Sequence, residues 1–125
     1  MLAANNGFYP DWSQGMSRMK GATPDIAKAF GGFFHALMKE GALSVREKEL
    51  IAFGIGFALR CEGCIYSHVE KCLKTGSTPE QILEAAGVAV MMQGGPTYTY
   101  LPKVLEALDQ FKAVQPVNPT RPAAA

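Results

Sequence analysis

The stretch CEGCIYSH, residues 61–68, contains the side chains of this chain that are best suited to chemistry. Cys61 and Cys64 are two of its three cysteines, and His68 follows Cys64 by four positions. On an α-helix of 3.6 residues per turn, these three side chains and Cys72 all fall on one face. Cys64 and His68 form an i, i+4 pair within side-chain reach. The spacing is compatible with a metal site, a redox centre, or small core residues beside a histidine.

A structural zinc site does not fit these residues. Zinc needs four ligands that converge on one point, and Cys61 and Cys72 would be about 16 Å apart along a single helix. The sequence has no second cysteine pair, and His35 is its only other histidine. The c-type haem signature requires a histidine directly after the second cysteine, where this chain has Ile65. We therefore expect no metal ligands here.

Redox chemistry fits the spacing better. A Cys-x-x-Cys pair at a helix start can close a disulfide with little motion, and the helix end lowers the pKa of a thiol. Cys61 falls in the first turn, where unpaired N–H groups and the helix dipole favour a thiolate. His68 could take the proton of Cys64 or hold its thiolate. The structural alternative is two small buried cysteines and a satisfied core histidine.

A carboxylate can join this group. Glu49 has no evident structural task and lies at the edge of an apolar run. If the helices that hold Glu49 and His68 fold back on each other, the two side chains come level and can meet directly or through a water. Gly54 and Gly56 would let the helices approach closely. A buried carboxylate there would orient the imidazole and raise its basicity; otherwise Glu49 is a solvated surface residue.

The elements that must position these residues are all predicted to be helices. Two capping boxes, residues 44–47 and 78–81, mark helix starts, and Gly41 and Gly76 are stop signals. The helix after Ser44 is apolar nearly all round, so we expect it to be central and buried. The first twenty residues are expected to be irregular, with at most one short helix. The predicted helices span residues 23–41 with Thr23 as N-cap, 44 to about 60, about 61–74, 78 to about 94, and about 98–113.

The length indicates one domain over residues 1–125, and the helix signals with no convincing strand pairs make it all-α. The tail, 114–125, has three prolines and little apolar content, so we expect disorder.

A net charge of +1 calls for neither nucleic acid nor an anionic membrane. The longest apolar run, residues 50–59, is too short to span a bilayer, and no secretory signal is visible, so a cytoplasmic protein is expected. The 48% hydrophobic content favours burial between subunits.

The four candidate residues together resemble a known motif. Glu49, Cys61, Cys64 and His68 match the E-x11-C-x2-C-x3-H pattern of alkylhydroperoxidase D-like proteins, which belong to the carboxymuconolactone decarboxylase superfamily. The likeness covers about residues 22–112. It implies an all-α subunit of the alkylhydroperoxidase D-like fold, with about five to six helices, that assembles into a homo-oligomer such as a trimer or hexamer. It also implies thiol-dependent peroxidase or disulfide-reductase chemistry.

The resemblance assigns a role to each residue. Cys64 would be the thiol that attacks a hydroperoxide, Cys61 the resolving thiol, His68 the proton acceptor and Glu49 the relay carboxylate. A thioredoxin-like or lipoyl protein would reduce the resulting disulfide, and no bound cofactor would be needed. The chain departs from some members at Gly63, where they carry a histidine, so one proton-relay group is missing.

Two other functions remain open from the sequence. A lactone decarboxylase of the same superfamily would use polar pocket residues and should survive replacement of Cys61 and Cys64 by serine. A non-catalytic redox sensor or oligomeric scaffold would form the disulfide without sustained turnover of peroxide.

Overall fold

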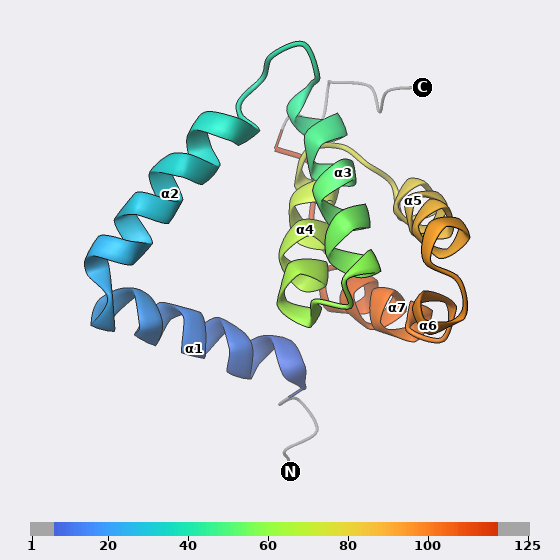
Figure 1. Cartoon of the computed structure of the whole chain (residues 1–125), viewed down its shortest axis with the longest axis horizontal. Coiled ribbons are helices and arrows are strands. Elements are labelled where there is room, and N and C mark those ends of the chain that lie inside the picture. The colour runs from blue at the N-terminus through green and yellow to red at the C-terminus, as the bar shows by residue number, and fades with distance from the viewer. Residues whose placement is uncertain (1–6, 118–125) are drawn as a thin grey trace. The chain divides into compact units, whose positions relative to one another are not determined.

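The computed structural model describes residues 7–117, and the chain there is helical, with no strand. The all-α fold class is therefore confirmed. Where one helix was expected over about 98–113, the structure has a short helix over 95–98 and a longer one over 101–110. The helices are α1 (Phe8–Ala22), α2 (Pro24–Met38), α3 (Val45–Ala58), α4 (Glu62–Lys74), α5 (Pro79–Gln93), α6 (Gly95–Tyr98) and α7 (Leu101–Gln110) (Figure 1).

The chain divides into two compact units, Met1–Lys39 and Glu40–Ala125. The first contains α1 and α2, which meet at Thr23. The backbone N–H and the hydroxyl of Thr23 both donate to the carbonyl of Met19, at 2.8 and 2.7 Å. The Thr23 side chain thus closes the end of α1 and makes no capping hydrogen bond to α2. The predicted position of Thr23 as the N-cap of α2 is confirmed, but its hydroxyl is turned toward Met19 and accepts no bond from α2.

Helix α1 corrects the expectation that the first twenty residues are irregular. Its apolar side chains Phe8, Trp12, Met16 and Met19 recur every three or four positions, which is the helical period. Phe8 and Trp12 stack with their ring centroids 6.0 Å apart. The helix was missed because it begins without a side-chain cap, so the usual start signal is absent.

The second unit holds the core. Helix α3 packs against α4 and α5, and α4 also packs against α7. Fully buried side chains come from all four helices, and each large one contributes roughly 1.5–3 kcal/mol of hydrophobic stabilisation. Tyr66 of α4 meets Phe111 edge to face, with centroids 6.3 Å apart. The largest fully buried side chains are Phe53, Phe57, Ile65, Ile82, Val69, Val104, Thr97 and Cys72.

Helix α3 is buried on one side only. Phe53 and Phe57 are fully buried, whereas Ile51, Ile55 and Leu59 are 49%, 57% and 69% exposed. The predicted central position of this helix is confirmed by its packing on α4 and α5, but it is only partly buried in the single chain, because these two helices cover only part of its circumference. An exposed apolar stripe is left along α3.

The C-terminal part also differs in detail from the predicted helix over 98–113. The chain leaves the helical path at Thr99 and Tyr100, and α7 begins at Leu101 because Pro102 fits only in a first helical turn. Beyond α7, the backbone N–H of Val117 donates to the carbonyl of Lys74 at 2.7 Å. The predicted disorder of the tail concerns mainly residues 118–125, which lie outside the described residues.

Within residues 7–117, no helix is long and apolar enough to cross a membrane.

Candidate redox-active site

The turn between α3 and α4 determines where the cysteines lie. Arg60 has a left-handed backbone (φ 55°). Its N–H donates to the carbonyl of Phe57 at 2.8 Å, and the N–H of Cys61 donates to that of Gly56 at 3.0 Å. These two bonds form a Schellman motif, which ends α3 and satisfies its last carbonyls. The chain reverses within these residues, so Cys61 becomes the N-cap of α4.

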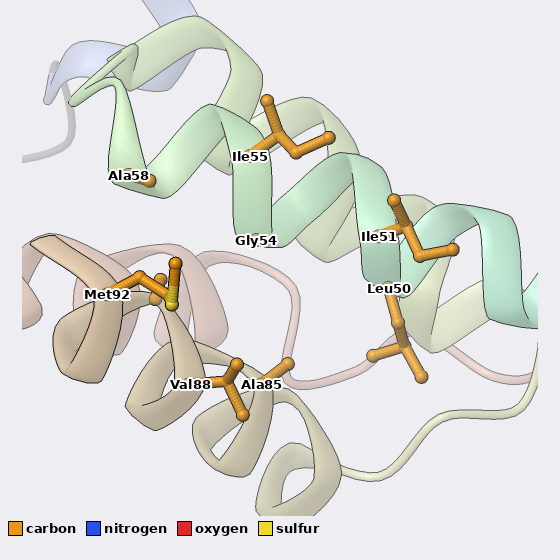
Figure 2. A pocket seen from close by; sticks show the side chains of 9 residues that line it. Leu50, Ile51, Gly54, Ile55, Ala58, Ala85, Val88 and Met92 are labelled. Atoms are coloured by element: carbon orange, nitrogen blue, oxygen red, sulfur yellow. The ribbon is translucent and has the colours of Figure 1, made fainter.

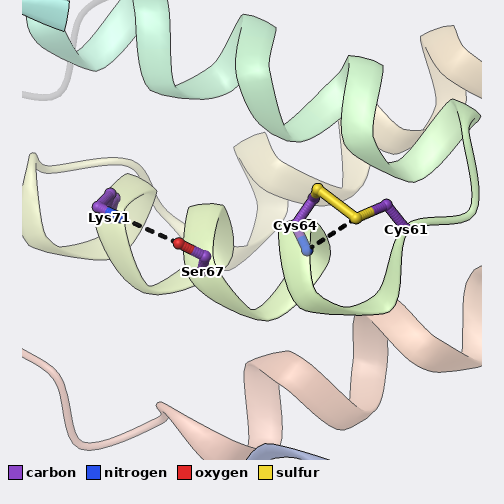
Figure 3. Close-up of a disulfide and its surroundings, with 4 residues drawn as sticks. All are labelled: Cys61, Cys64, Ser67 and Lys71. Carbon is purple, nitrogen blue, oxygen red and sulfur yellow. Dashed lines mark hydrogen bonds between the residues drawn. A yellow bond between two sulfur atoms is a disulfide. The ribbon is translucent and has the colours of Figure 1, made fainter. Parts of the chain in front are cut away.

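Cys61 and Cys64 are joined by a disulfide at the start of α4 (Figure 3). Their Cα atoms are 5.2 Å apart, and both side chains are half-buried. The backbone N–H of Cys64 donates to Sγ of Cys61 at 3.3 Å, so the sulfur takes the place that a serine or aspartate oxygen usually has at an N-cap. The helix N-terminus therefore faces Cys61 with N–H groups, which favour negative charge on its sulfur after reduction.

Gly56 allows α3 to approach the disulfide. A Cβ placed on Gly56 would lie 2.7 Å from Cβ of Cys64, closer than two carbon atoms can pack. The predicted use of Gly56 as a close-contact residue is therefore confirmed. The same prediction for Gly54 was wrong: a Cβ there would meet nothing within 4 Å. The two glycines are two positions apart in the sequence, so they lie on different faces of α3.

The predicted contact between the carboxylate and the histidine is present. Oε1 of Glu49 lies 2.7 Å from Nδ1 of His68. Glu49 is only 3% exposed, so it is not the solvated surface residue that remained possible from sequence. With the carboxylate ionised, Nδ1 carries the proton and donates it to Glu49, which places the lone pair of the neutral ring on Nε2. His68 is one helical turn after Cys64, so this arrangement can exchange a proton with a thiol.

Cys72 continues the same face of α4 but is fully buried, as predicted for a small core residue. Burial and, to a smaller extent, the negative charge of Glu49 together raise the pKa of its thiol to about 12, although Arg46 opposes the rise. Cys72 is therefore a neutral thiol at physiological pH and a poor nucleophile. The two cysteines at the start of α4 are the chemically available ones.

Glu62, which follows Cys61, does not act as an isolated negative charge beside the cysteines. Its Oε2 lies 3.1 Å from Nζ of Lys103 on α7. The hydrogen bond and the charge of Glu62 raise the pKa of Lys103. Burial, followed by the charges of Glu106 and Glu62, raises the pKa of the nearby Tyr66 hydroxyl. Lys103 thus partly compensates the charge of Glu62, a contact that the sequence reasoning missed because the two residues are 41 positions apart.

A second missed residue is Arg46 in the first turn of α3. It is only 7% exposed, and its Nη1 donates to Oε1 of Gln81 at 3.2 Å. Its position three residues before Glu49 was the available signal, since such residues share a helix face.

No cluster of three or more histidine, cysteine or acidic side chains in the described part of the chain could hold a metal ion.

An apolar groove of about 410 Å³ lies between α3 and α5 (Figure 2). None of the four candidate residues lines it. All of its lining residues are apolar, so it offers no side chain that could bind a charged group. They are Leu50, Ile51, Gly54, Ile55, Ala58, Ala85, Val88, Ala89 and Met92.

Comparison with known proteins identifies the family of the chain. The model of the carboxymuconolactone decarboxylase family matches residues 24–107. The chain belongs to this family. The superfamily inferred from the four-residue motif is thereby confirmed.

Among curated relatives, uncharacterized protein 4 in cox locus of Paracoccus denitrificans is 35% identical over 102 residues, covering 82% of this chain and 92% of the relative. An uncharacterized protein of Haemophilus influenzae is 30% identical over 113 residues, covering 85% and 100%.

Solved structures of this family have the same fold. The apo form of a carboxymuconolactone decarboxylase family protein from Legionella pneumophila matches with a TM-score of 0.75 and 35% identity, over 82% of this chain and 91% of that one. A family protein from Thermotoga maritima, with a suggested involvement in the antioxidative response, matches with a TM-score of 0.64 and 29% identity, over 70% and 90%. The fold is thus that of the family.

Proposed function

We propose that this family member is a thiol-dependent peroxidase or disulfide oxidoreductase that reduces hydroperoxides through Cys61 and Cys64. The observation that carries the proposal is the combination of a disulfide at a helix N-terminus with a buried carboxylate–imidazole pair one turn further on. A cysteine pair with a purely structural role would not need the buried Glu49 carboxylate and His68 imidazole beside it. The suggested antioxidative involvement of the Thermotoga maritima relative agrees with the proposal.

The proposed reaction begins with the reduced protein. His68 accepts the proton of the Cys64 thiol, and Glu49 holds the ring and stabilises the imidazolium. The Cys64 thiolate attacks the terminal oxygen of the hydroperoxide and breaks the O–O bond. The sulfur becomes a sulfenic acid, and the leaving alkoxide takes the proton from His68 and departs as an alcohol.

The second half of the cycle forms the disulfide seen in the structure. The Cys61 thiol displaces hydroxide from the sulfenic sulfur of Cys64, and its proton leaves with the hydroxide as water. An external dithiol, such as a thioredoxin-like or lipoyl protein, then reduces the disulfide by exchange and is itself oxidised. The cycle needs no bound cofactor, and a cytoplasmic location would keep such reductants at hand.

Self-association belongs to the same proposal. Apolar side chains of α2 and α3 are more than half exposed in the single chain, among them Phe30, Phe33 and Ile55. Exposed apolar surface on this scale is typical of subunit interfaces. We infer a homo-oligomer, for which a trimer or hexamer is the expected size, and light scattering of the purified protein would measure its mass.

The groove between α3 and α5 does not favour the decarboxylase alternative. A lactone that carries carboxylates needs charged or hydrogen-bonding partners, and every residue that lines this groove is apolar. The double variant with serine at Cys61 and Cys64 separates the two functions. It should abolish peroxide reduction if the proposal holds, and it should spare lactone decarboxylation if the chain is a decarboxylase.

The proposal is tested by titrating thiols of the reduced protein before and after one equivalent of organic hydroperoxide, with mass spectrometry to locate any disulfide. Loss of two thiols mapped to Cys61 and Cys64 is expected. In Cys61→Ser, Cys64 should stop at the sulfenic acid, which dimedone traps, and Cys64→Ser should not react. Cys72→Ser is the control and should react as the wild type does. Three thiols remaining after long exposure would overturn the proposal.

Turnover separates an enzyme from a redox sensor. With a dithiol reductant in excess, the peroxidase should consume many equivalents of hydroperoxide per chain. A sensor would form the same disulfide once and then stop.

A further inference from the structure

The unit that contains α1 and α2 has no core of its own. Across residues 8–38, which the structure describes in full, no side chain of either helix is buried in the single chain. Two helices of 15 residues each are marginal in water unless an apolar face packs against another surface. The main apolar face lies on α2, where Ile26, Phe30, Phe33 and Leu37 are each more than half exposed. These four residues, the α2 stripe, need a covering surface in the assembled protein.

The spacing within the α2 stripe indicates that another helix covers it. Its members are separated by four, three and four positions. Alternation of three and four gives an average period of 3.5, which is the period of the seam between two helices in a coiled coil. On an ideal helix, all four side chains fall within about 60° of the circumference. The positions that flank the stripe are also uncharged: they are Ala27, Ala29, Phe34 and Ala36.

The order of the residues in the α2 stripe is the same from either end. An aliphatic residue stands at each end and two phenylalanines stand between them, with symmetric spacing. If two α2 helices pair antiparallel about a two-fold axis, Phe30 lies opposite Phe33 of the partner subunit, and Ile26 lies opposite Leu37 of the partner subunit. A two-fold contact uses the same patch on both copies. Phe30 and Phe33 already lie with centroids 6.4 Å apart in one chain, so four rings would meet at the centre.

The charges of α2 favour the antiparallel direction. Asp25 lies in the first turn of the helix, and Lys39 follows directly after its last residue. A parallel pair would bring like charges to the same end, whereas an antiparallel pair brings Asp25 of one copy to the end that has the other copy's lysine. The two helix dipoles also oppose each other in an antiparallel pair. Lys28 and His35 lie on the opposite side of α2 from the stripe, so they stay in water.

We propose that α2 pairs antiparallel with α2 of a second copy of this chain along the α2 stripe. The inference rests on the self-association proposed above and names the surface that brings it about. No other protein is required, because the stripe is complementary to itself. A particle held together by this two-fold contact contains an even number of chains. The pairing therefore favours a hexamer over a trimer.

Light scattering of the full chain after size-exclusion chromatography tests the pairing. Phe33→Asp places a charge at the centre of the contact and should halve the mass of the particle. Lys28→Asp changes an exposed residue on the opposite side of the same helix and should leave the mass unchanged. Circular dichroism checks that both variants are folded. An unchanged mass in folded Phe33→Asp, or an odd number of chains in the wild type, would overturn this inference alone; a monomeric wild type would overturn the proposed self-association as well.

Cross-linking tests the direction of the pair and does not depend on the folding of Phe33→Asp. Phe30→Cys and Phe33→Cys are made separately in a background of Cys61→Ser and Cys64→Ser. A disulfide requires Cβ atoms about 4 Å apart, so it reports side chains that lie opposite each other. When the two variants are co-expressed, oxidation should join unlike chains several-fold faster than it joins the chains of either variant alone. Equally fast cross-linking of Phe30→Cys to itself would show a parallel pair, and no cross-link between unlike chains would show that another surface covers α2; either result overturns the inference.

Discussion

The contact between Gly56 and Cys64 gives the sharpest prediction of stability. Replacing Gly56 by alanine adds a methyl group whose carbon would lie 2.7 Å from Cβ of Cys64. The neighbour is the first side-chain atom of a cysteine in a helix, so it cannot rotate away, and the two helices must separate. Gly54→Ala is the matched control, because the same methyl group on the same helix meets nothing within 4 Å.

The expected magnitudes follow from two opposing effects. Alanine is favoured over glycine inside a helix by about 1 kcal/mol, and this gain applies to both variants. Overpacking at a close contact costs about 1–3 kcal/mol, and this loss applies to Gly56→Ala alone. The two variants should therefore differ by about 1–3 kcal/mol in free energy of unfolding. For a chain of this size, that corresponds to a difference of roughly 4–12 °C in Tm.

Thermal unfolding followed by circular dichroism measures the difference, at equal protein concentration because self-association affects Tm. The same movement of the helices should draw His68 on α4 away from Glu49 on α3, so Gly56→Ala should also slow thiol oxidation while Gly54→Ala should not. If Gly56→Ala melts at the same temperature as Gly54→Ala and reacts equally fast, the close contact between α3 and α4 does not hold the site together.

Three further predictions concern single side chains. Because burial raises the pKa of Cys72 to about 12, reduced native protein should show two thiols that react with Ellman's reagent at pH 8, and a third only after denaturation; three fast thiols would contradict the buried position. The backbone N–H and hydroxyl of Ser44 hold the pKa of Glu47 below 4.5. The stability advantage of wild type over Glu47→Gln should therefore be constant above pH 4.5 and be lost as the pH falls through the lowered pKa of Glu47 in the folded protein. An advantage that does not depend on pH would exclude this linkage. Lys103→Met should cost no more than about 1 kcal/mol, measured by urea unfolding, and less in high salt, because the pair with Glu62 is partly exposed; a larger, salt-independent loss would show that Lys103 packs rather than pairs.

Local signals in the sequence were sufficient for much of this fold. Both capping boxes form with their reciprocal hydrogen bonds, at Ser44 with Glu47 and at Thr78 with Gln81. These are contacts within four residues, so the sequence states them directly. Gly76, with φ 103°, ends α4 where a left-handed residue was expected.

The predicted end of α3 near Arg60 is confirmed, although Arg60 has a left-handed conformation that glycine or asparagine usually adopts. The position of the exposed stripe on α3 could not be predicted, since hydrophobicity does not tell whether the covering surface belongs to the same chain or to another.

The candidate site was predictable because it is built from two adjacent helices. Once the chain was expected to reverse between α3 and α4, residues at comparable distances from the turn came level, which placed Glu49 near the stretch from His68 to Cys72. Arg46 and Lys103 depend on α5 and α7, whose placement relative to α4 comes from packing of the whole core. No short-range pattern reports such contacts.

The sulfur of Cys61 at the N-cap of α4 gives the site a built-in spectroscopic reporter. In the disulfide, this sulfur accepts from the N–H of Cys64 at 3.3 Å. A thiolate is a stronger acceptor than a disulfide sulfur, because it carries a full negative charge. Reduction followed by loss of the Cys61 proton should therefore shift the amide proton resonance of Cys64 downfield and slow its exchange with solvent. A single backbone signal would then follow the oxidation state of the protein, without labels and without a substrate.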